Sequence, residues 1–312
     1  MKALVTGGAG FIGSNIAQAL QAGGHEVRVL DDLSTGFREN VDGSMELLEG
    51  EVSDEDLVRK AVDGVDVVFH QAAHRAVLRS VEQPLATDTA NTHGTLTVLK
   101  AALDAGVRRV VYASSSSVYG GAEVQPTPET FPTNPRSPYA VTKLAAEHYC
   151  RVFTELYGLE TVALRYFNVY GPRQRPDSAY AAVIPLFIEA LRRGEPAVVH
   201  GDGLQSRDFS YIDDVVTVNL RAAEAPASSC AGKVYNVAGG RPYSLLDLLE
   251  ILGRIMDVAP TRVHTDPRSG DVKHSGADIS AARADLGYEP RTGLEEGLHK
   301  TVAWFAAAAP AP

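Results

Sequence analysis

The first 165 residues alternate between short apolar runs and longer amphipathic stretches. Apolar runs that do not alternate with polar residues predict buried strands at residues 3–5, 27–30, 65–70, 109–113 and 161–166, and a late one at 234–237. The stretches between them predict helices at residues 12–21, 54–62, 85–105 and 137–157. Buried strands separated by helices are typical of a parallel sheet covered on both faces. We therefore expect an α/β protein with a doubly wound parallel sheet.

The pattern changes after Asn168, where prolines interrupt the chain. Further elements are expected as helices at residues 183–193, 245–256 and 279–286 and a short strand at 197–200. We predict one domain over residues 1–168, with about 208–240 returning to its sheet, and a smaller α/β cap domain over 169–312. In open α/β sheets, ligands bind at the carboxyl ends of the strands. The cap is therefore expected to cover a substrate site there.

Composition narrows the class of protein. The 29 basic and 39 acidic residues among 312 give a net charge of 29 − 39 = −10, which argues against phosphate-neutralising nucleic-acid binding. Cys150 and Cys230 show no metal-ligand spacing and are expected to be buried free thiols, so no metal site is predicted. No apolar run approaches the roughly 18 residues of a membrane helix or resembles a signal peptide. A cytoplasmic protein without a membrane partner is expected.

A glycine-rich turn joins the first predicted strand to the first helix. Gly7, Gly10 and Gly13 are spaced three residues apart, with Phe11 and Ile12 at the start of the helix. Glycines let the chain turn sharply and approach a pyrophosphate, to which the helix offers free N–H groups. Asp31 ends the second strand, 31 − 13 = 18 residues after Gly13, where a carboxylate binds ribose hydroxyls and repels a 2′-phosphate. The pattern indicates a dinucleotide-binding Rossmann fold that prefers NAD, with Asp32 as the less favoured ribose ligand.

Candidate catalytic residues stand at the start of the helix predicted at 137–157. Ser137 is suited to cap this helix, and Pro138 suits its first position. Tyr139 and Lys143 are four residues apart and share one helix face. An ammonium and a helix N-terminus both favour a tyrosine phenolate over the phenol. Because the strand at 109–113 runs into four serines, hydroxyls are expected beside this pair.

At these motifs the chain, from Lys2 to about Trp304, resembles an extended short-chain dehydrogenase/reductase of the NAD-dependent epimerase/dehydratase family. It is most similar to the UDP-hexose 4-epimerases. The resemblance implies bound NAD and catalysis by Ser115, Tyr139 and Lys143. It also implies cofactor contacts from Glu51, at a position usually held by an adenine-reading Asp, from the adjacent Val52, and from Asn91. A homodimer is a further expectation of the family.

The resemblance extends to the second half of the chain and implies a UDP-sugar as substrate. Asn168 would contact its pyrophosphate or sugar, while Arg207 and Arg268 would hold its diphosphate, since a guanidinium fork matches phosphate oxygens. Ser275, seven residues after Arg268, matches a position where a small side chain admits a 2-acetamido group. Residues 180–185 also resemble the branch that accepts N-acetylated sugars. Arg173 and Arg175 are expected to be solvated or structural.

Other reactions of the family remain as alternatives. Dehydratases carry Asp-Glu where this chain has Ser116 and Ser117, and decarboxylases carry Glu just before the valine. Neither carboxylate is present, which disfavours both reactions and leaves reversible oxidation at C4. UDP-glucuronate stays open as a substrate, because Ser115, Ser116 and Ser117 could hold its carboxylate and residues 173–177 resemble that branch. A catalytically silent NAD-binding protein is the alternative that the intact catalytic set argues against.

Overall fold

A central parallel sheet organises the protein. The computed structural model describes residues 1–75, 77–174, 182–267 and 272–308. Within these residues the sheet has seven strands in the order β11-β6-β5-β4-β1-β2-β3. The strands are β1 (Lys2–Thr6), β2 (Glu26–Asp31), β3 (Glu46–Glu49), β4 (Val67–His70), β5 (Arg109–Ser115), β6 (Glu160–Tyr166) and β11 (Lys233–Val237). The order reverses between β1 and β4, which confirms the doubly wound sheet and places a ligand crevice there.

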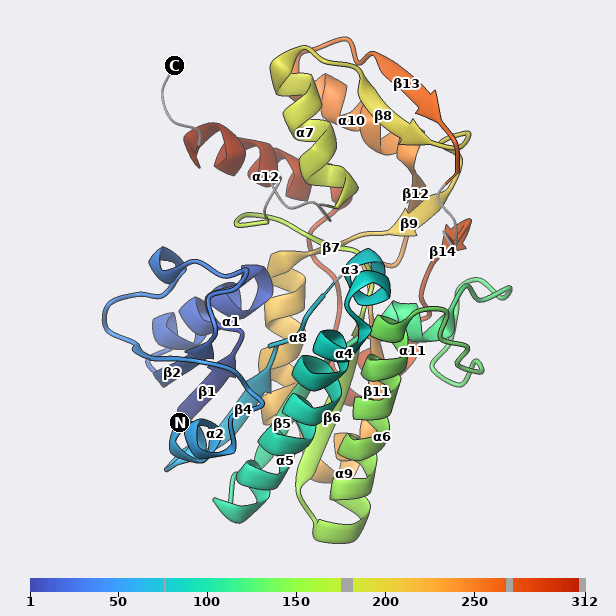
Figure 1. Ribbon diagram of the computed structural model, residues 1–312. Coiled ribbons are helices and arrows are strands. Elements are labelled where there is room, and N and C mark those ends of the chain that lie inside the picture. Colours follow the sequence, from blue (N-terminus) through green and yellow to red (C-terminus); the bar gives the residue numbers. More distant parts are fainter. Residues whose placement is uncertain (76, 175–181, 268–271, 309–312) are drawn as a thin grey trace.

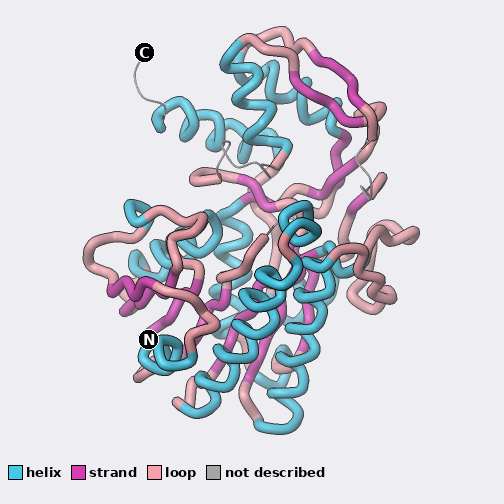
Figure 2. Tube along the Cα trace, viewed as in Figure 1, coloured by secondary structure: helices cyan, strands magenta, loops and turns pink. Residues whose placement is uncertain are grey.

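Helices cover both faces of this sheet (Figures 1 and 2). One face carries α1 (Phe11–Ala22) and α8 (Ile212–Glu224), and the other carries α2 (Glu55–Val62), α5 (Gly94–Asp104) and α6 (Pro138–Tyr157). Alternate residues of each strand enter different cores. Val5 packs with Ile16 of α1, whereas its neighbour Leu4 belongs to the cluster that holds Val98 of α5. Because both faces of the sheet are buried, the sequence of each central strand is a continuous apolar run.

The helix expected at residues 85–105 is built from several pieces. After α3 (Val77–Glu82), the chain forms α4 (Pro84–Asp88), a π-helical turn over Thr89–His93, and then α5. A π turn inserts one extra residue into a helix and occurs often at functional sites. It bears on the site because Thr89 and Ala90 line the cavity described below.

The second half of the chain forms a smaller α/β unit above the sheet in Figure 1. Its helices are α7 (Val183–Arg193), α10 (Leu245–Met256) and α12 (Leu294–Ala308). Its short strands pair as β8 (Ala197–His200) with β13 (Arg262–Thr265), β9 (Ser206–Asp208) with β12 (Pro242–Ser244) and β14 (His274–Ser275), and β7 (Val169–Tyr170) with β10 (Ser210–Tyr211). Below it, α9 (Ala227–Cys230) and α11 (Ser280–Leu286) lie near β11 at the edge of the sheet. The predicted sheet-plus-cap architecture is confirmed, while its exact domain limits stay a prediction.

Candidate active site

The glycine turn after β1 forms the base of a cavity of about 510 Å³. Gly7 has φ +67°, which favours glycine, and a Cβ on Gly13 would lie 2.1 Å from the carbonyl oxygen of Gly7. Gly10, the N-cap of α1, has no side-chain cap among the described residues. A Cβ there would meet only the Gly7 oxygen, at 3.2 Å. The turn is thus tightly packed between Gly7 and Gly13 and leaves space on the cavity side of Gly10. This shape fits a ligand phosphate at the helix N-terminus.

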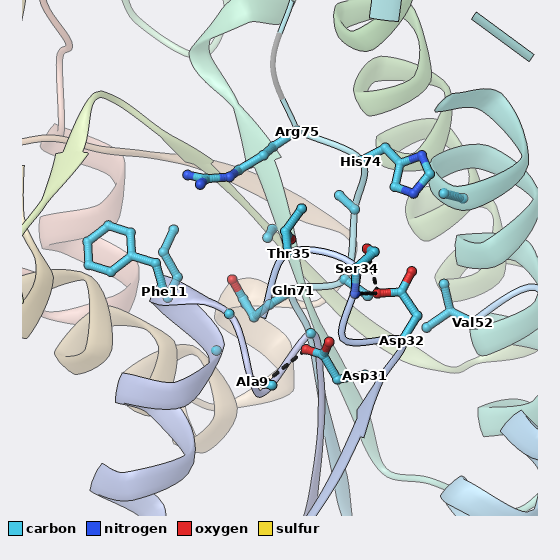
Figure 3. Close-up of a pocket in the computed structure, with 18 of the residues that line it drawn as sticks. Ala9, Phe11, Asp31, Asp32, Ser34, Thr35, Val52, Gln71, His74 and Arg75 are labelled. Atoms are coloured by element: carbon cyan, nitrogen blue, oxygen red, sulfur yellow. Dashed lines mark hydrogen bonds between the residues drawn. The ribbon is translucent and has the colours of Figure 1, made fainter. Parts of the chain in front are cut away.

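Asp31 lies at the end of β2 beside this turn (Figure 3). Its carboxylate accepts hydrogen bonds from the backbone N–H of Ala9 at 2.9 Å and of Leu33 at 2.8 Å. Burial raises the pKa of this carboxyl, and the two N–H groups act in the opposite direction. Asp32 is exposed and accepts from Ser34. The buried, oriented Asp31 is therefore better placed for a ribose than Asp32.

The far end of the cavity carries the residues expected around an adenine. Glu51 and Val52 line it, although Glu51 is exposed and accepts a hydrogen bond from Ser53. Figure 3 shows Val52 beside Asp32 and His74. Together with the glycine turn and Asp31, these residues give the cavity the parts that a dinucleotide needs, namely a ribose carboxylate, a phosphate turn and an apolar wall.

The catalytic candidates meet at the other end of the same cavity. Ser137 caps α6 by accepting a hydrogen bond from Ala140 at 3.2 Å, as expected from the sequence. Lys143 is buried, donates from Nζ to the carbonyl oxygen of Ala113 at 2.9 Å, and lies 5.8 Å from the ring centre of Tyr139. Ser115, at the end of β5, lines the cavity together with both side chains. The structure thus brings together three residues that are distant in sequence.

Electrostatics at this end of the cavity are dominated by burial. Burial raises the pKa of the Tyr139 phenol, while the Ser115 hydroxyl and the charge of Arg75 lower it. Burial lowers the pKa of Lys143 to about 8, and the nearby carboxylate of Glu147 opposes that shift. Two ionisable side chains whose pKa values are shifted by burial thus lie at one end of the cavity, an arrangement that is common at functional sites.

Asn91 takes a supporting position in the π turn. It is buried, and its side chain accepts from the backbone N–H of His74 at 2.7 Å and donates to Thr142 at 3.0 Å. It therefore ties the segment after β4 to the catalytic helix, and it is not among the residues that line the cavity. Its contact with the cofactor stays a prediction.

Several cavity residues carry no motif in the sequence. Gln71, His74 and Arg75 follow β4, and Thr35 and Asn40 follow β2. Figure 3 shows Arg75 reaching over the cavity toward Phe11. The position of these residues after strand ends is the signal that could have found them, because all parallel strands end at this edge of the sheet.

A buried polar network lies directly behind the catalytic residues. Arg165 of β6 donates to both carboxylate oxygens of Glu147 on α6, at 2.9 and 2.7 Å. Glu147 also accepts from the hydroxyl of Ser114, the neighbour of Ser115. The remaining Arg165 nitrogen donates to the Tyr119 hydroxyl at 2.8 Å. The network thus joins the end of β5 to the helix that carries Tyr139 and Lys143.

A second cavity of about 570 Å³ adjoins the first on the side of the cap. Asn168 and Arg207, both predicted to bind substrate, line it, and Asn168 donates to the backbone oxygen of Asp208 at 3.1 Å. Ser275 is paired with Arg207 in the register of β14 and β9. Val169 and Gln174 line both cavities. Asn168 and Arg207 therefore line a cavity that shares part of its wall with the first, and Ser275 lies opposite Arg207 in the adjoining strand.

The substrate roles of all these residues stay predictions, as do those of Ser116, Ser117 and Arg268. Ser116 and Ser117 form a short 3-10 turn after β5, and the Ser117 hydroxyl is buried without a partner among the described residues. Arg268 lies outside the described residues.

In the described part of the chain, no helix is long and apolar enough to cross a bilayer. The same residues contain no group of three or more His, Cys, Asp or Glu side chains that could hold a metal ion.

Known proteins share this architecture. Residues 3–238 match the model of the NAD dependent epimerase/dehydratase family. The UDP-glucose 4-epimerase of Mycolicibacterium smegmatis is 40% identical over 98% of both chains. A crystal structure of a Thermotoga maritima UDP-glucose 4-epimerase with UDP-glucose is 38% identical, with a TM-score of 0.94 over 98% of this chain and 99% of that one.

A third similar protein is the UDP-N-acetylglucosamine 4-epimerase of Methanobrevibacter ruminantium M1, in complex with UDP-N-acetylmuramic acid. It is 39% identical, with a TM-score of 0.94 over 99% of both chains. The match of the family model over most of the chain agrees with the cavity, which has the glycine turn, ribose carboxylate and Ser-Tyr-Lys group of an NAD enzyme. The chain belongs to the NAD-dependent epimerase/dehydratase family.

Proposed function

We propose that the protein is a UDP-sugar 4-epimerase that interconverts C4 epimers by transient oxidation at C4. The observation that carries the proposal is the meeting of Ser115, Tyr139 and Lys143 in one cavity with the glycine turn and Asp31. The glycine turn and Asp31 would hold NAD there, and the cofactor would supply a reversible hydride acceptor for C4 of the sugar. The second cavity, with Asn168 and Arg207, offers room for the nucleotide half of the substrate beside the reacting groups.

The residues of the chain would handle the proton. The Tyr139 oxygen takes the proton of the sugar 4-hydroxyl, and the Ser115 hydroxyl hydrogen-bonds the same sugar oxygen. Because burial raises the pKa of Tyr139, the phenolate needs the positive charges of Lys143 and Arg75 to offset that burial. Lys143, fixed by its bond to the Ala113 carbonyl, keeps its ammonium at one place through the reaction.

The sugar must present both faces of C4 for the configuration to invert. Strong diphosphate contacts from Arg207 and Arg268 would hold one end of the substrate, while short serine side chains contact the sugar weakly enough to let the 4-keto intermediate turn. Elimination of water would need an acid and a base near C5 and C6. Ser116 and Ser117 stand where dehydratases carry these carboxylates, which favours epimerisation over dehydration.

We propose UDP-glucose and UDP-galactose as one substrate pair and UDP-N-acetylglucosamine and its epimer as a second. The small Ser275, placed beside Arg207, supports room for a 2-acetamido group. UDP-glucuronate is the alternative substrate, supported by the hydroxyls of Ser115, Ser116 and Ser117, which could hold its carboxylate. Ser275→Tyr should suppress turnover of UDP-N-acetylglucosamine more than that of UDP-glucose, and equal loss on both would refute this role of Ser275.

The experiment that tests the function offers the purified protein UDP-glucose, UDP-N-acetylglucosamine and UDP-glucuronate, with products identified by NMR and mass. We expect a C4 epimer of unchanged mass from at least one of them. Tyr139→Phe should fold and retain NAD while losing most turnover. A product of lower mass would indicate dehydration or decarboxylation, and near-normal turnover by Tyr139→Phe would overturn the catalytic assignment.

We also propose that the protein is a homodimer. Apolar side chains on α3, α4 and α6, which lie next to one another in Figure 1, are exposed, with Leu85 at 83% and Val141 at 51%. Exposed apolar clusters of this kind mark protein interfaces. Light scattering should give the mass of two chains and Leu85→Glu that of one. A monomeric parent protein would contradict the proposal.

A further inference from the structure

Arg173 occupies an unusual position in the wall of the cofactor cavity. It follows β7 in a turn closed by the hydrogen bond from the Gln174 N–H to the Gly171 carbonyl, at 3.3 Å. Its φ is +70°, in the left-handed region that side-chain-bearing residues rarely adopt. It lines the first cavity together with Phe11 and Ile12 of the α1 N-terminus. A strained arginine at a ligand cavity suggests that its side chain has a use there.

Among the described residues, the guanidinium group of Arg173 is anchored by a hydrogen bond but has no counter-charge. One terminal nitrogen, Nη2, donates to the side-chain oxygen of Gln18 on α1. The other, Nη1, is buried and has no hydrogen-bond partner among the described residues. No described carboxylate forms an ion pair with it, and burial lowers its pKa. A half-buried cation with one buried, unpartnered nitrogen and no counter-charge in the described part of the chain favours an anion supplied by a ligand.

Gln18 holds the guanidinium of Arg173 against the side of α1. Gln18 stands seven residues after Phe11, two turns along the same face of α1. The N-terminus of that helix has no side-chain cap in the described part of the chain, and it opens into the same cavity. Arg173 and the N-terminus of α1 therefore line the same cavity, and both favour negative charge in it.

We propose that Arg173 is a ligand of the NAD diphosphate, with Gln18 as the residue that positions it. The inference rests on the NAD site of the proposed function. The cofactor is favoured over the substrate as the source of the diphosphate because Arg173 lines the first cavity and not the second, whereas Arg207 lines the second and not the first. Each diphosphate is thus served by its own arginine.

The test compares ligands that contain different parts of the cofactor. Dissociation constants of NAD, ADP-ribose, adenosine and UDP are measured by calorimetry on the full-length protein after dialysis to remove bound nucleotide. The NAD content of each variant as purified is a second readout. Arg173→Gln removes the charge, Arg173→Lys retains it without the fork, and Gln18→Ala removes the anchor. Arg254→Gln is the matched control, since Arg254 is an exposed residue of α10 that lines neither cavity.

Arg173→Gly separates binding from folding. Glycine adopts the +70° backbone without strain, so after removal of NAD from both proteins this variant should melt at about the same temperature as the parent. A loss of NAD from a protein that melts normally then cannot be due to misfolding.

Arg173→Gln and Arg173→Gly should weaken NAD and ADP-ribose roughly 10- to 100-fold, the effect expected for a charge-assisted hydrogen bond. Arg173→Lys and Gln18→Ala should weaken both ligands less. Adenosine and UDP, as well as every ligand of Arg254→Gln, should stay within about twofold of the parent.

Unchanged NAD and ADP-ribose affinity would overturn the inference, and so would a loss confined to UDP, which would assign Arg173 to the substrate. An equal loss for adenosine would also overturn it, because adenosine has no diphosphate. Failure of the proposed function is separate, since the ligand series can behave as expected in a protein that epimerises no UDP-sugar.

Discussion

The buried pair of Glu147 and Arg165 allows a quantitative prediction about stability. Their side chains are 4% and 6% exposed and are joined by two hydrogen bonds, at 2.9 and 2.7 Å. Glu147→Gln keeps the shape of the side chain but leaves the Arg165 charge without its counter-ion. Removing one partner of a buried ion pair costs about 3–5 kcal/mol. This is a large part of the roughly 5–15 kcal/mol by which a folded protein is stable.

The assay is urea denaturation at fixed protein and NAD concentrations, because bound ligand changes the apparent stability. Glu155→Gln is the control on the same helix, since the Glu155–Arg151 pair spans 3.8 Å with side chains 61% and 55% exposed. That exposed pair should contribute less than about 1 kcal/mol. The midpoint of Glu147→Gln should fall well below that of Glu155→Gln, with an unchanged slope.

A double variant tests whether removing the whole ion pair costs less stability than removing one partner. Replacing both Glu147 and Arg165 by Met removes the buried charge together with its partner, and it should recover at least half of the stability lost in Glu147→Gln. Equal midpoints for Glu147→Gln and Glu155→Gln would refute the argument that burial gives this pair its effect.

Three further predictions concern pH and packing. Burial raises the pKa of Asp208 from 3.8 to about 6. Its contribution to stability is therefore full below pH 3.8 and is lost as the pH rises through 6, a loss of about 3 kcal/mol. The parent should lose stability relative to Asp208→Asn between pH 4 and 7 in urea titrations, and parallel profiles would contradict this. Gly13→Ala places a Cβ 2.1 Å from the Gly7 carbonyl oxygen and should abolish NAD retention, whereas Gly43→Ala, which has open space, should not; equal NAD content in the two variants would be the contrary result. Because burial lowers the pKa of Lys143 to about 8, turnover should decline as its ammonium deprotonates above that pH, and a flat profile to pH 10 would exclude this role.

Much of the sheet could be predicted from the sequence because burial on both faces leaves a simple mark. Strands such as β4 and β5 are continuous apolar runs, and two of the helices around the sheet have side-chain N-caps, Asp54 for α2 and Ser137 for α6. The edge strand β3 has polar ends and one fully buried residue, so its pattern is weak. Helix α8 is rich in valine, which disfavours helices in isolation, and packing against α1 and the sheet stabilises it.

The meeting of Ser115, Tyr139 and Lys143 in one cavity could be predicted because short motifs mark it, namely the glycine turn, the serines after β5 and the Tyr139–Lys143 pair. The remaining wall of the cavity could not be predicted, because Arg75 and Arg173 enter it from loops whose course depends on tertiary structure. Arg173 was expected to be solvated or structural. In the structure it is half-buried and lines the cofactor cavity through a left-handed backbone that no local sequence rule assigns to arginine.

The central claim, oxidation and reduction at C4, has a direct isotopic test. The protein is incubated with a UDP-hexose carrying deuterium at C4, in ordinary water, and the C4 epimer is examined by NMR. If a hydride leaves C4 and returns to the same carbon, the epimer retains the deuterium. Replacement of the deuterium by solvent hydrogen would contradict the account, because it would show that C4 is inverted by exchange of a proton.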